Sequence, residues 1–260
     1  MSALSRCAVE IRAAWRLLRL FVHLVLGVLR VRLIFPLLSA SRREHHKQAW
    51  SAAMIRMLGV RLQQDALPLP QRCVVVCNHI SWLDIFVINA LVQTWFVSKD
   101  DVRHWPLIGW LVDATGTIFI DRTRRSAAAQ TLQALQAKLQ TEQARVTFFP
   151  EGTTTDGSKL LPFSAALFEA ARHGETPVAA LSLRYLDPQG QPSRAPAYDG
   201  DISFVDCLLA IVRSPRIEVS LELAALLPAG LERREYALQS RQQIARALGQ
   251  PDGQLVETQD

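Results

Sequence analysis

The sequence predicts an α/β fold, in which a mostly parallel central sheet is flanked by helices and preceded by an N-terminal amphipathic helical hairpin. From residue 73 onward, apolar runs of strand length alternate with helical stretches, a pattern typical of parallel sheets. Before that point, apolar residues surround a narrow polar stripe at helical spacing. The 260 residues, 49% of them hydrophobic, suit one large domain or a domain with an appendage.

The first predicted helix is defined by its polar stripe. The stripe residues recur every three or four positions, and so share one helical face: Arg12, Arg16, Arg19, His23, Gly27 and Arg30. The positions around them are aliphatic or aromatic. A DNA-binding helix would not expose so much aliphatic surface to water, which argues against a nucleic acid partner. We expect this helix to lie in a bilayer interface with its arginines at the lipid headgroups.

The charge distribution points to an anionic lipid surface. The excess behind the net charge of +5 lies in residues 1–47, which hold nine Lys or Arg and two Glu. The longest uncharged run, Leu20–Leu29, is half of the ~20 apolar residues that a membrane span needs. Extending it adds Arg30 and Arg32, each costing ~2.5–3.5 kcal/mol at the bilayer centre. We expect a monotopic helix; a single N-terminal anchor and a helix docked on the protein body are the alternatives.

A second helical stretch runs from Pro36 to about Leu58 and completes the hairpin. The chain thus divides into a membrane-associating hairpin at 1–60, an α/β domain at 61–250 and a polar tail at 251–260 that we expect to be disordered. The four cysteines form no CxxC pair, and two of them border an apolar run. This pattern indicates buried free thiols in a reducing compartment.

Within the α/β domain the expected elements follow in order. Strands are expected at 73–77, 94–98, 117–121, 145–149, 177–183 and 216–223, and helices at 82–92, 105–113, 126–140, 162–173 and 231–248. Residues 188–201 are rich in Pro and Gly and are expected to form a surface loop.

The first candidate site follows the first strand of this domain. His79 lies where parallel strands gather functional residues, and Asp84 lies near the first turn of the next helix. A carboxylate that holds one imidazole nitrogen leaves the other as a proton acceptor. The alternative is structural: Ser81-x-x-Asp84 resembles a helix capping box, with His79 an ordinary loop residue. On this stretch alone the two interpretations are about even.

Two further strand ends carry polar residues. VTFFPEGTTTDG, residues 146–157, ends a strand in a loop where Glu151 lies between a proline and Gly152. Such loops can offer backbone N–H groups to an anion or a developing oxyanion, although a plain Asp-Gly turn is the alternative. GTIFIDR, residues 116–122, ends in Arg122, and Lys99 and Arg103 lie upstream. Because guanidinium groups suit phosphate, their recurrence at strand ends predicts one shared site.

The order of these motifs resembles the glycerolipid acyltransferases, the lysophosphatidic acid acyltransferase group. NHISWLD resembles their HxxxxD signature, GTIFIDR their second motif and FFPEGT their third, and TPVAALSL stands at the place of a fourth. The resemblance covers roughly residues 70–185. The amphipathic N-terminus also agrees with a family that works at membranes, and the resemblance implies a place at the cytoplasmic face of a bacterial inner membrane.

The resemblance implies acyl transfer from acyl-CoA or acyl-carrier protein to the free hydroxyl of a lysolipid such as 1-acylglycerol-3-phosphate, in phospholipid biosynthesis. His79 would be the general base and Asp84 its orienting partner. The implied substrate-binding residues are Lys99, Arg122, Glu151, Gly152 and Thr153. Glu151 and Gly152 would either hold the polar end of the acceptor or shape the loop. No metal and no redox cofactor are implied.

Two departures from the family pattern concern the acceptor. Thr154 stands where an arginine is usual, and Ala180 where a second proline is common. Both leave open another acceptor, such as a different lysophospholipid or an ornithine lysolipid. Two alternative functions lie outside acyl transfer to a lysolipid. A serine hydrolase using Ser81 or Ser164 lacks a G-x-S-x-G elbow, and a non-catalytic membrane lipid-binding protein would not need the intact His79 and Asp84.

Overall fold

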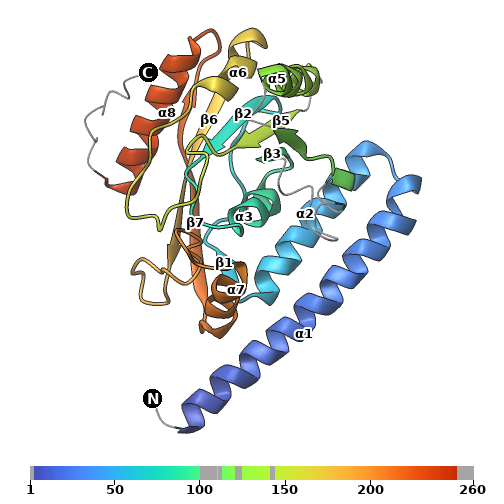
Figure 1. The fold of residues 1–260 in the computed structure, drawn as a ribbon, viewed down its shortest axis with the longest axis vertical. Coiled ribbons are helices and arrows are strands. Elements are labelled where there is room, and N and C mark those ends of the chain that lie inside the picture. The colour runs from blue at the N-terminus through green and yellow to red at the C-terminus, as the bar shows by residue number, and fades with distance from the viewer. Residues whose placement is uncertain (1–2, 100–109, 111–112, 121–124, 141–143, 251–260) are drawn as a thin grey trace.

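The computed structural model describes residues 3–99, 110, 113–120, 125–140 and 144–250 (Figure 1). Its strands are β1 (Val60–Leu62), β2 (Cys73–Cys77), β3 (Trp95–Lys99), β4 (Ile118–Ile120), β5 (Arg145–Phe148), β6 (Val178–Leu186) and β7 (Ile217–Leu227). Its helices include α1 (Ala3–Leu33), η1 (Phe35–Leu37), α2 (Ala40–Met57), α3 (Asp84–Leu91), α5 (Arg125–Leu139), η3 (Ala166–Phe168), α6 (Glu169–His173), α7 (Phe204–Arg213) and α8 (Arg233–Leu248).

The seven strands form one sheet in the order β1-β7-β6-β2-β5-β3-β4. Every neighbouring pair is parallel except β6 and β7, so the prediction of a mostly parallel sheet is confirmed. The six expected strands are present within a few residues of their expected bounds. The strand β1 and the helix α7 were not expected from the sequence. Most of the helix expected at 105–113, and the tail at 251–260, lie outside the described residues.

Two apolar cores lie on the opposite faces of the sheet, and β2 contributes to both because successive side chains of a strand alternate. Cys73, Val75 and Cys77 pack with α2, α3 and α7 on one face, whereas Val74 and Val76 pack with α5, α6 and α8 on the other. The thiols of Cys73, Cys77 and Cys207 are buried and free, as expected, and Cys7 is exposed. Burial raises the pKa of Cys73 to about 11.

The N-terminal hairpin is formed by α1, η1 and α2, and α1 runs diagonally along one side of the molecule (Figure 1). The two helices meet closely at Gly27, where a Cβ atom would lie 2.7 Å from the indole nitrogen of Trp50. His23 stacks on the same indole at 4.7 Å and donates from Nε2 to the carbonyl oxygen of Trp50 at 3.1 Å. A small residue therefore allows the close contact that holds the hairpin together.

The polar stripe of α1 turns toward the protein over much of its length. Arg16 donates to three carbonyl oxygens at the C-terminal end of α7, those of Val212, Ser214 and Pro215, at 2.6–3.0 Å. Arg12 donates to the carbonyl oxygen of Arg213 at 2.6 Å. The last carbonyls of a helix lack intrahelical partners and carry partial negative charge, which a guanidinium can satisfy. The expectation that these arginines reach lipid headgroups is therefore wrong for Arg12 and Arg16.

The face of α1 that points away from the protein body is apolar and exposed. Its residues recur at helical spacing and include Ile11, Trp15, Leu18, Val22, Val25, Leu29 and Leu33. On the docked side, Ala13 and Leu20 are buried in the core. Among the helices in the described ranges, none combines the length and the apolarity needed to cross a membrane.

Candidate active site

The candidate site lies at the carboxyl ends of the neighbouring strands β6, β2 and β5, in the middle of the sheet. Val76 of β2 pairs with Phe148, the last residue of β5, so the two following loops leave the sheet together. Asn78 fixes the start of the first loop, because its side chain accepts from the N–H of Leu183 at 2.8 Å and donates to the carbonyl of the same residue at 3.0 Å. His79 is thereby held beside the FFPEGT loop, as sequence analysis expected.

His79 and Asp84 meet directly. Nδ1 of the imidazole lies 2.8 Å from Oδ2 of Asp84, whose side chain is fully buried, whereas 18% of the imidazole is exposed. The same Oδ2 accepts the backbone N–H groups of Ile80 at 2.7 Å and Ser81 at 3.0 Å. The bond to Ser81 is the one that a capping box makes. The catalytic and the structural interpretations of Asp84 are therefore compatible, since one oxygen atom serves both.

Two aromatic residues complete this arrangement, and sequence analysis missed both. Phe149 stacks on the imidazole of His79 with ring centroids 3.8 Å apart and planes within 8°. Tyr185 of β6 donates its hydroxyl to Oδ1 of Asp84 at 2.7 Å across 101 residues of sequence. Phe149 belongs to the FFPEGT stretch and could have been suspected. Tyr185 carries no sequence signal, because only the pairing of β2 with β6 brings it to Asp84.

Glu151 holds the backbone of two loops. Its Oε1 accepts the N–H of His79 at 2.8 Å, and its Oε2 accepts the N–H of Leu161 at 2.9 Å. Burial raises the pKa of Glu151 to about 7, against the opposing effect of these two hydrogen bonds. Of the two roles expected for this residue, the contacts favour shaping the loop.

The rest of the motif loop is turned by glycine and tied to its neighbours. Gly152 has a φ of 74°, a left-handed conformation that favours glycine, and its N–H donates to the carbonyl of Phe149 at 3.1 Å. Thr153 is exposed. Thr154 donates its hydroxyl to the carbonyl of Tyr198, and the N–H of Thr155 donates to the carbonyl of His79 at 2.9 Å. The N–H of Tyr198 in turn donates to the carbonyl oxygen of Ile80 at 3.0 Å, so the segment around Tyr198 is bonded to both loops.

The expected basic residues are described only in part. Lys99 is the last residue of β3 and pairs in register with Ile120, so the strands that lead to Lys99 and to residue 121 end together. The side chain of Lys99, and the residues Arg103 and Arg122, lie outside what the structure describes. Their approach to the imidazole of His79 remains a prediction.

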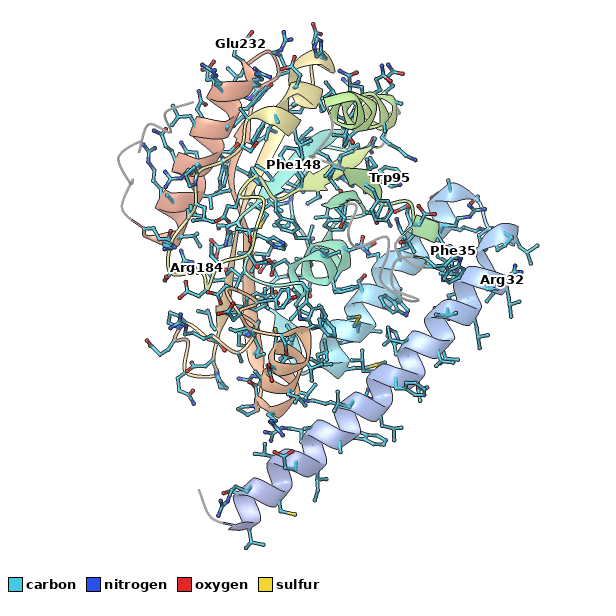
Figure 2. The ribbon with its side chains drawn as sticks, in the orientation of Figure 1. Arg32, Phe35, Trp95, Phe148, Arg184 and Glu232 are labelled. Carbon is cyan, nitrogen blue, oxygen red and sulfur yellow. The ribbon has the colours of Figure 1, made fainter. Side chains whose placement is uncertain are left out.

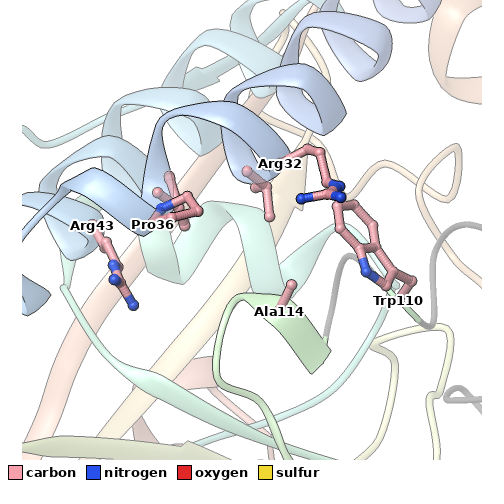
Figure 3. A pocket seen from close by; sticks show the side chains of 7 residues that line it. Arg32, Pro36, Arg43, Trp110 and Ala114 are labelled. Atoms are coloured by element: carbon pink, nitrogen blue, oxygen red, sulfur yellow. The ribbon is translucent and has the colours of Figure 1, made fainter.

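A cavity of about 480 Å³ lies apart from His79, at the turn of the hairpin. Its lining is mixed, with two arginines among apolar residues: Val31, Arg32, Phe35, Pro36, Arg43, Trp110 and Ala114. Figure 3 shows Arg32 beside Trp110 at one end and Arg43 at the other. Arg32 and Phe35 lie at the hairpin turn, well away from Phe148 at the end of β5 (Figure 2). Neither His79 nor Asp84 contributes to this cavity.

Comparisons with known proteins converge on one family. The family model described as Acyltransferase matches residues 59–184. The 1-acyl-sn-glycerol-3-phosphate acyltransferase of Neisseria gonorrhoeae is 33% identical over 200 residues, which are 76% of this chain and 78% of the relative. The lyso-ornithine lipid O-acyltransferase of Rhodobacter capsulatus is 41% identical over 172 residues, which are 64% of this chain and 62% of the relative.

The fold also has a counterpart among solved structures. The crystal structure of the 1-acyl-sn-glycerophosphate acyltransferase of Thermotoga maritima superimposes with a TM-score of 0.66. The match covers 94% of this chain and 96% of the other at 16% sequence identity. The likeness therefore extends to the whole architecture, including the N-terminal part outside the residues that the family model matches.

Proposed function

The chain belongs to the acyltransferase family, and on that premise we propose that it transfers a fatty acyl group from a thioester donor to the free hydroxyl of a lysolipid. The donor is acyl-CoA or an acylated carrier protein, and the pathway is phospholipid biosynthesis. The observation that carries the proposal is the 2.8 Å contact between Nδ1 of His79 and the buried carboxylate of Asp84. It supplies a general base and its orienting partner.

His79 acts as the base. Because the Asp84 carboxylate accepts the Nδ1 proton, the lone pair of the neutral imidazole resides on Nε2, where it can take the proton of the acceptor hydroxyl. Phe149, stacked on the ring, and Glu151, bonded to the His79 N–H, limit the movement of this residue. General-base assistance of this kind contributes typically ~10²–10⁴-fold to rate.

The acyl group moves in one displacement. As His79 removes the proton, the acceptor oxygen attacks the thioester carbonyl, the new ester bond forms, and the carbon–sulfur bond breaks. The thiolate leaves and takes the proton from the imidazolium of His79, which the Asp84 carboxylate stabilises in between and which thereby returns to its neutral form. No acyl-enzyme, metal or redox cofactor enters this scheme. Lys99 and Arg122 are proposed to bind phosphate groups of donor or acceptor, and Gly152 and Thr153 to contact the acceptor.

Two acceptor classes are proposed. The first is a lysophospholipid such as 1-acylglycerol-3-phosphate, the class in the name of the Neisseria relative. The second is an ornithine lysolipid, the class in the name of the Rhodobacter relative. Thr154 favours the second class, because its hydroxyl is bonded to the carbonyl of Tyr198 and a threonine brings no charge to a phosphate. Lys99 and Arg122 would have to supply the cations for the first.

We propose that the reaction takes place at the cytoplasmic face of a bacterial inner membrane, with residues 1–60 as the membrane-associating part and 61–250 as the catalytic part. The exposed apolar face of α1 supports this, since it would insert at the boundary of headgroups and acyl chains. The cavity with Arg32, Arg43 and Trp110 supports a preference for anionic lipid, because indole rings and guanidinium groups both favour the headgroup region.

Release of thiol from acyl-CoA and from an acylated carrier protein, each measured with and without an acceptor, tests this function. Acceptor-dependent thiol release together with mass detection of the acylated product is the expected result. Release without an acceptor would identify a thioesterase, and no release with either 1-acylglycerol-3-phosphate or a lyso-ornithine lipid, from either donor, would reject the proposal. Running both acceptors side by side separates the two classes.

A further inference from the structure

The carboxylate of Asp84 has an unusual environment. Its side chain is fully buried, and at Oδ2 it meets three donors, Nδ1 of His79 and the N–H groups of Ile80 and Ser81. At Oδ1 the hydroxyl of Tyr185 lies 2.7 Å away and is the one donor found there in the described part of the chain. A buried carboxylate stays ionised only if donors or cations offset the loss of hydration. Tyr185 therefore faces the atom that most needs a partner.

Tyr185 is rigidly placed. It lies in β6 and is only 3% exposed, its backbone pairs with Val219 of β7, and its carbonyl accepts the N–H of Ser193 at 2.8 Å. Burial and the nearby Asp84 raise the pKa of the phenol well above its usual value, so the hydroxyl remains a donor at every pH at which the enzyme works. The sheet thus aims a fixed donor at a buried oxygen.

We infer that Tyr185 is a positioning residue that acts on His79 through Asp84. With a donor on each oxygen, the carboxylate is held against rotation about its Cβ–Cγ bond, and Oδ2 stays in line with Nδ1 of His79. The hydroxyl also draws charge toward Oδ1, which moderates how strongly Oδ2 stabilises the imidazolium. This inference rests on the proposed role of His79 as base and adds a third member to that pair.

Removing the Tyr185 hydroxyl should favour the protonated form of both Asp84 and His79. In Tyr185→Phe the carboxylate is less stabilised as an anion, so it binds a proton more readily, and its uncompensated charge favours the protonated form of the imidazole. Both changes require a higher pH before His79 is a neutral base beside an ionised carboxylate. The acid limb of the rate profile should therefore move to higher pH. A purely structural tyrosine would leave the position of that limb unchanged.

Tyr236→Phe is the matched control. Tyr236 is also fully buried, and its hydroxyl donates to the carbonyl of Pro228 at 2.9 Å, in the core on the other face of the sheet. We expect kcat of Tyr185→Phe to fall about tenfold to a hundredfold, as befits the loss of one hydrogen bond to a charged group. KM for the acceptor should change less than kcat. Tyr236→Phe should lower Tm without moving the acid limb.

The deciding measurement is a titration of the ring NMR signals of His79, assigned with His79→Ala, in wild type, Tyr185→Phe and Tyr236→Phe. An upward move of the titration in Tyr185→Phe alone supports the inference. No move, or equal moves in both variants, overturns it. Because this titration needs no substrate, a chain that proved inactive with every lysolipid would refute the proposed function and leave this result standing. If Tyr185→Phe fails to fold, 3-fluorotyrosine at residue 185, a stronger donor, should move the titration downward, and an unchanged titration would overturn the inference.

Discussion

Replacing Glu151 with glutamine should change how the stability of the protein depends on pH. The carboxylate accepts two backbone N–H groups, those of His79 and Leu161, at 2.8 and 2.9 Å. Burial nevertheless raises its pKa from 4.5 to about 7. The ionised form is thus less favourable in the folded chain than in water. The ionised Glu151 therefore lowers the free energy of unfolding while its hydrogen bonds fix the geometry of the loop.

The direction follows from proton binding. Below pH 4.5 the carboxyl is protonated in both folded and unfolded chains, so the full stability is present. Between 4.5 and about 7 the unfolded chain loses the proton while the folded chain keeps it, and rising pH therefore favours unfolding. At ~1.4 kcal/mol per unit of pKa difference, the loss is complete just above pH 7 and amounts to about 3 kcal/mol.

The assay is urea unfolding of wild type and Glu151→Gln at pH 5, 6, 7 and 8. The amide does not titrate, and its NH2 group must face one of the two backbone N–H donors, which costs about 1–3 kcal/mol at every pH. Wild type should therefore be the more stable at pH 5, and its stability relative to Glu151→Gln should fall by about 2.5 kcal/mol between pH 5 and pH 8.

Asp156→Asn is the control for this assay. Asp156 lies on the same loop and is half-buried, and its hydrogen bonds with Ser158 lower its pKa. Its stabilising effect is lost only as pH falls through that lowered pKa, so the variant should parallel wild type between pH 5 and 8. Parallel curves for wild type and Glu151→Gln would refute the reasoning. A wild-type advantage that grew with pH would mean that the two N–H bonds outweigh burial.

Further predictions test the base, the membrane face and the acceptor. His79→Ala should abolish acyl transfer with little change in Tm, and Asp84→Asn should lose most activity, because an amide supports an imidazolium poorly; near-wild-type rates in Asp84→Asn would reduce its role to helix capping. Leu18→Asp, on the exposed face of α1, should weaken binding to vesicles containing anionic lipid while leaving Tm unchanged. Arg16→Gln should lower Tm and leave vesicle binding closer to wild type; identical behaviour of these two variants would contradict the assignment of faces. Thr154→Arg should raise kcat/KM for 1-acylglycerol-3-phosphate relative to a lyso-ornithine lipid, and an unchanged ratio would mean that residue 154 does not contact the headgroup.

The sheet and the pairing of His79 with Asp84 could be predicted because both depend on local patterns. The sequence shows one strand followed by Asn78-His79 and another that runs into FFPEGT. Parallel strands bring their carboxyl ends to the same side of a sheet, and the pairing of β2 with β5 places these two ends together. Tyr185 could not be predicted, because its role depends on which strand neighbours β2. The three-residue β1 is too short for a periodic signal. The ten residues of α7 are periodic but few, and they lie between the surface loop expected at 188–201 and the strand expected at 216–223, where the sequence analysis assigns no element.

The helix α1 shows why hydrophobic periodicity alone misassigned the arginines. A helix that packs on a protein core and also lies against a bilayer has two apolar faces, one for each. The polar stripe of such a helix marks a boundary between the two faces and does not show which way its side chains turn. Arg16 lies at the boundary that meets α7, and the unpaired carbonyls there attract it, whereas Arg19 and Arg30 on the same stripe stay exposed. The N-terminal excess of positive charge is thus divided between arginines that dock α1 and exposed arginines, which we propose meet an anionic surface. Salt screens exposed charges more strongly than partly buried ones. Rising ionic strength should therefore release the protein from anionic vesicles before it loosens α1 from α7.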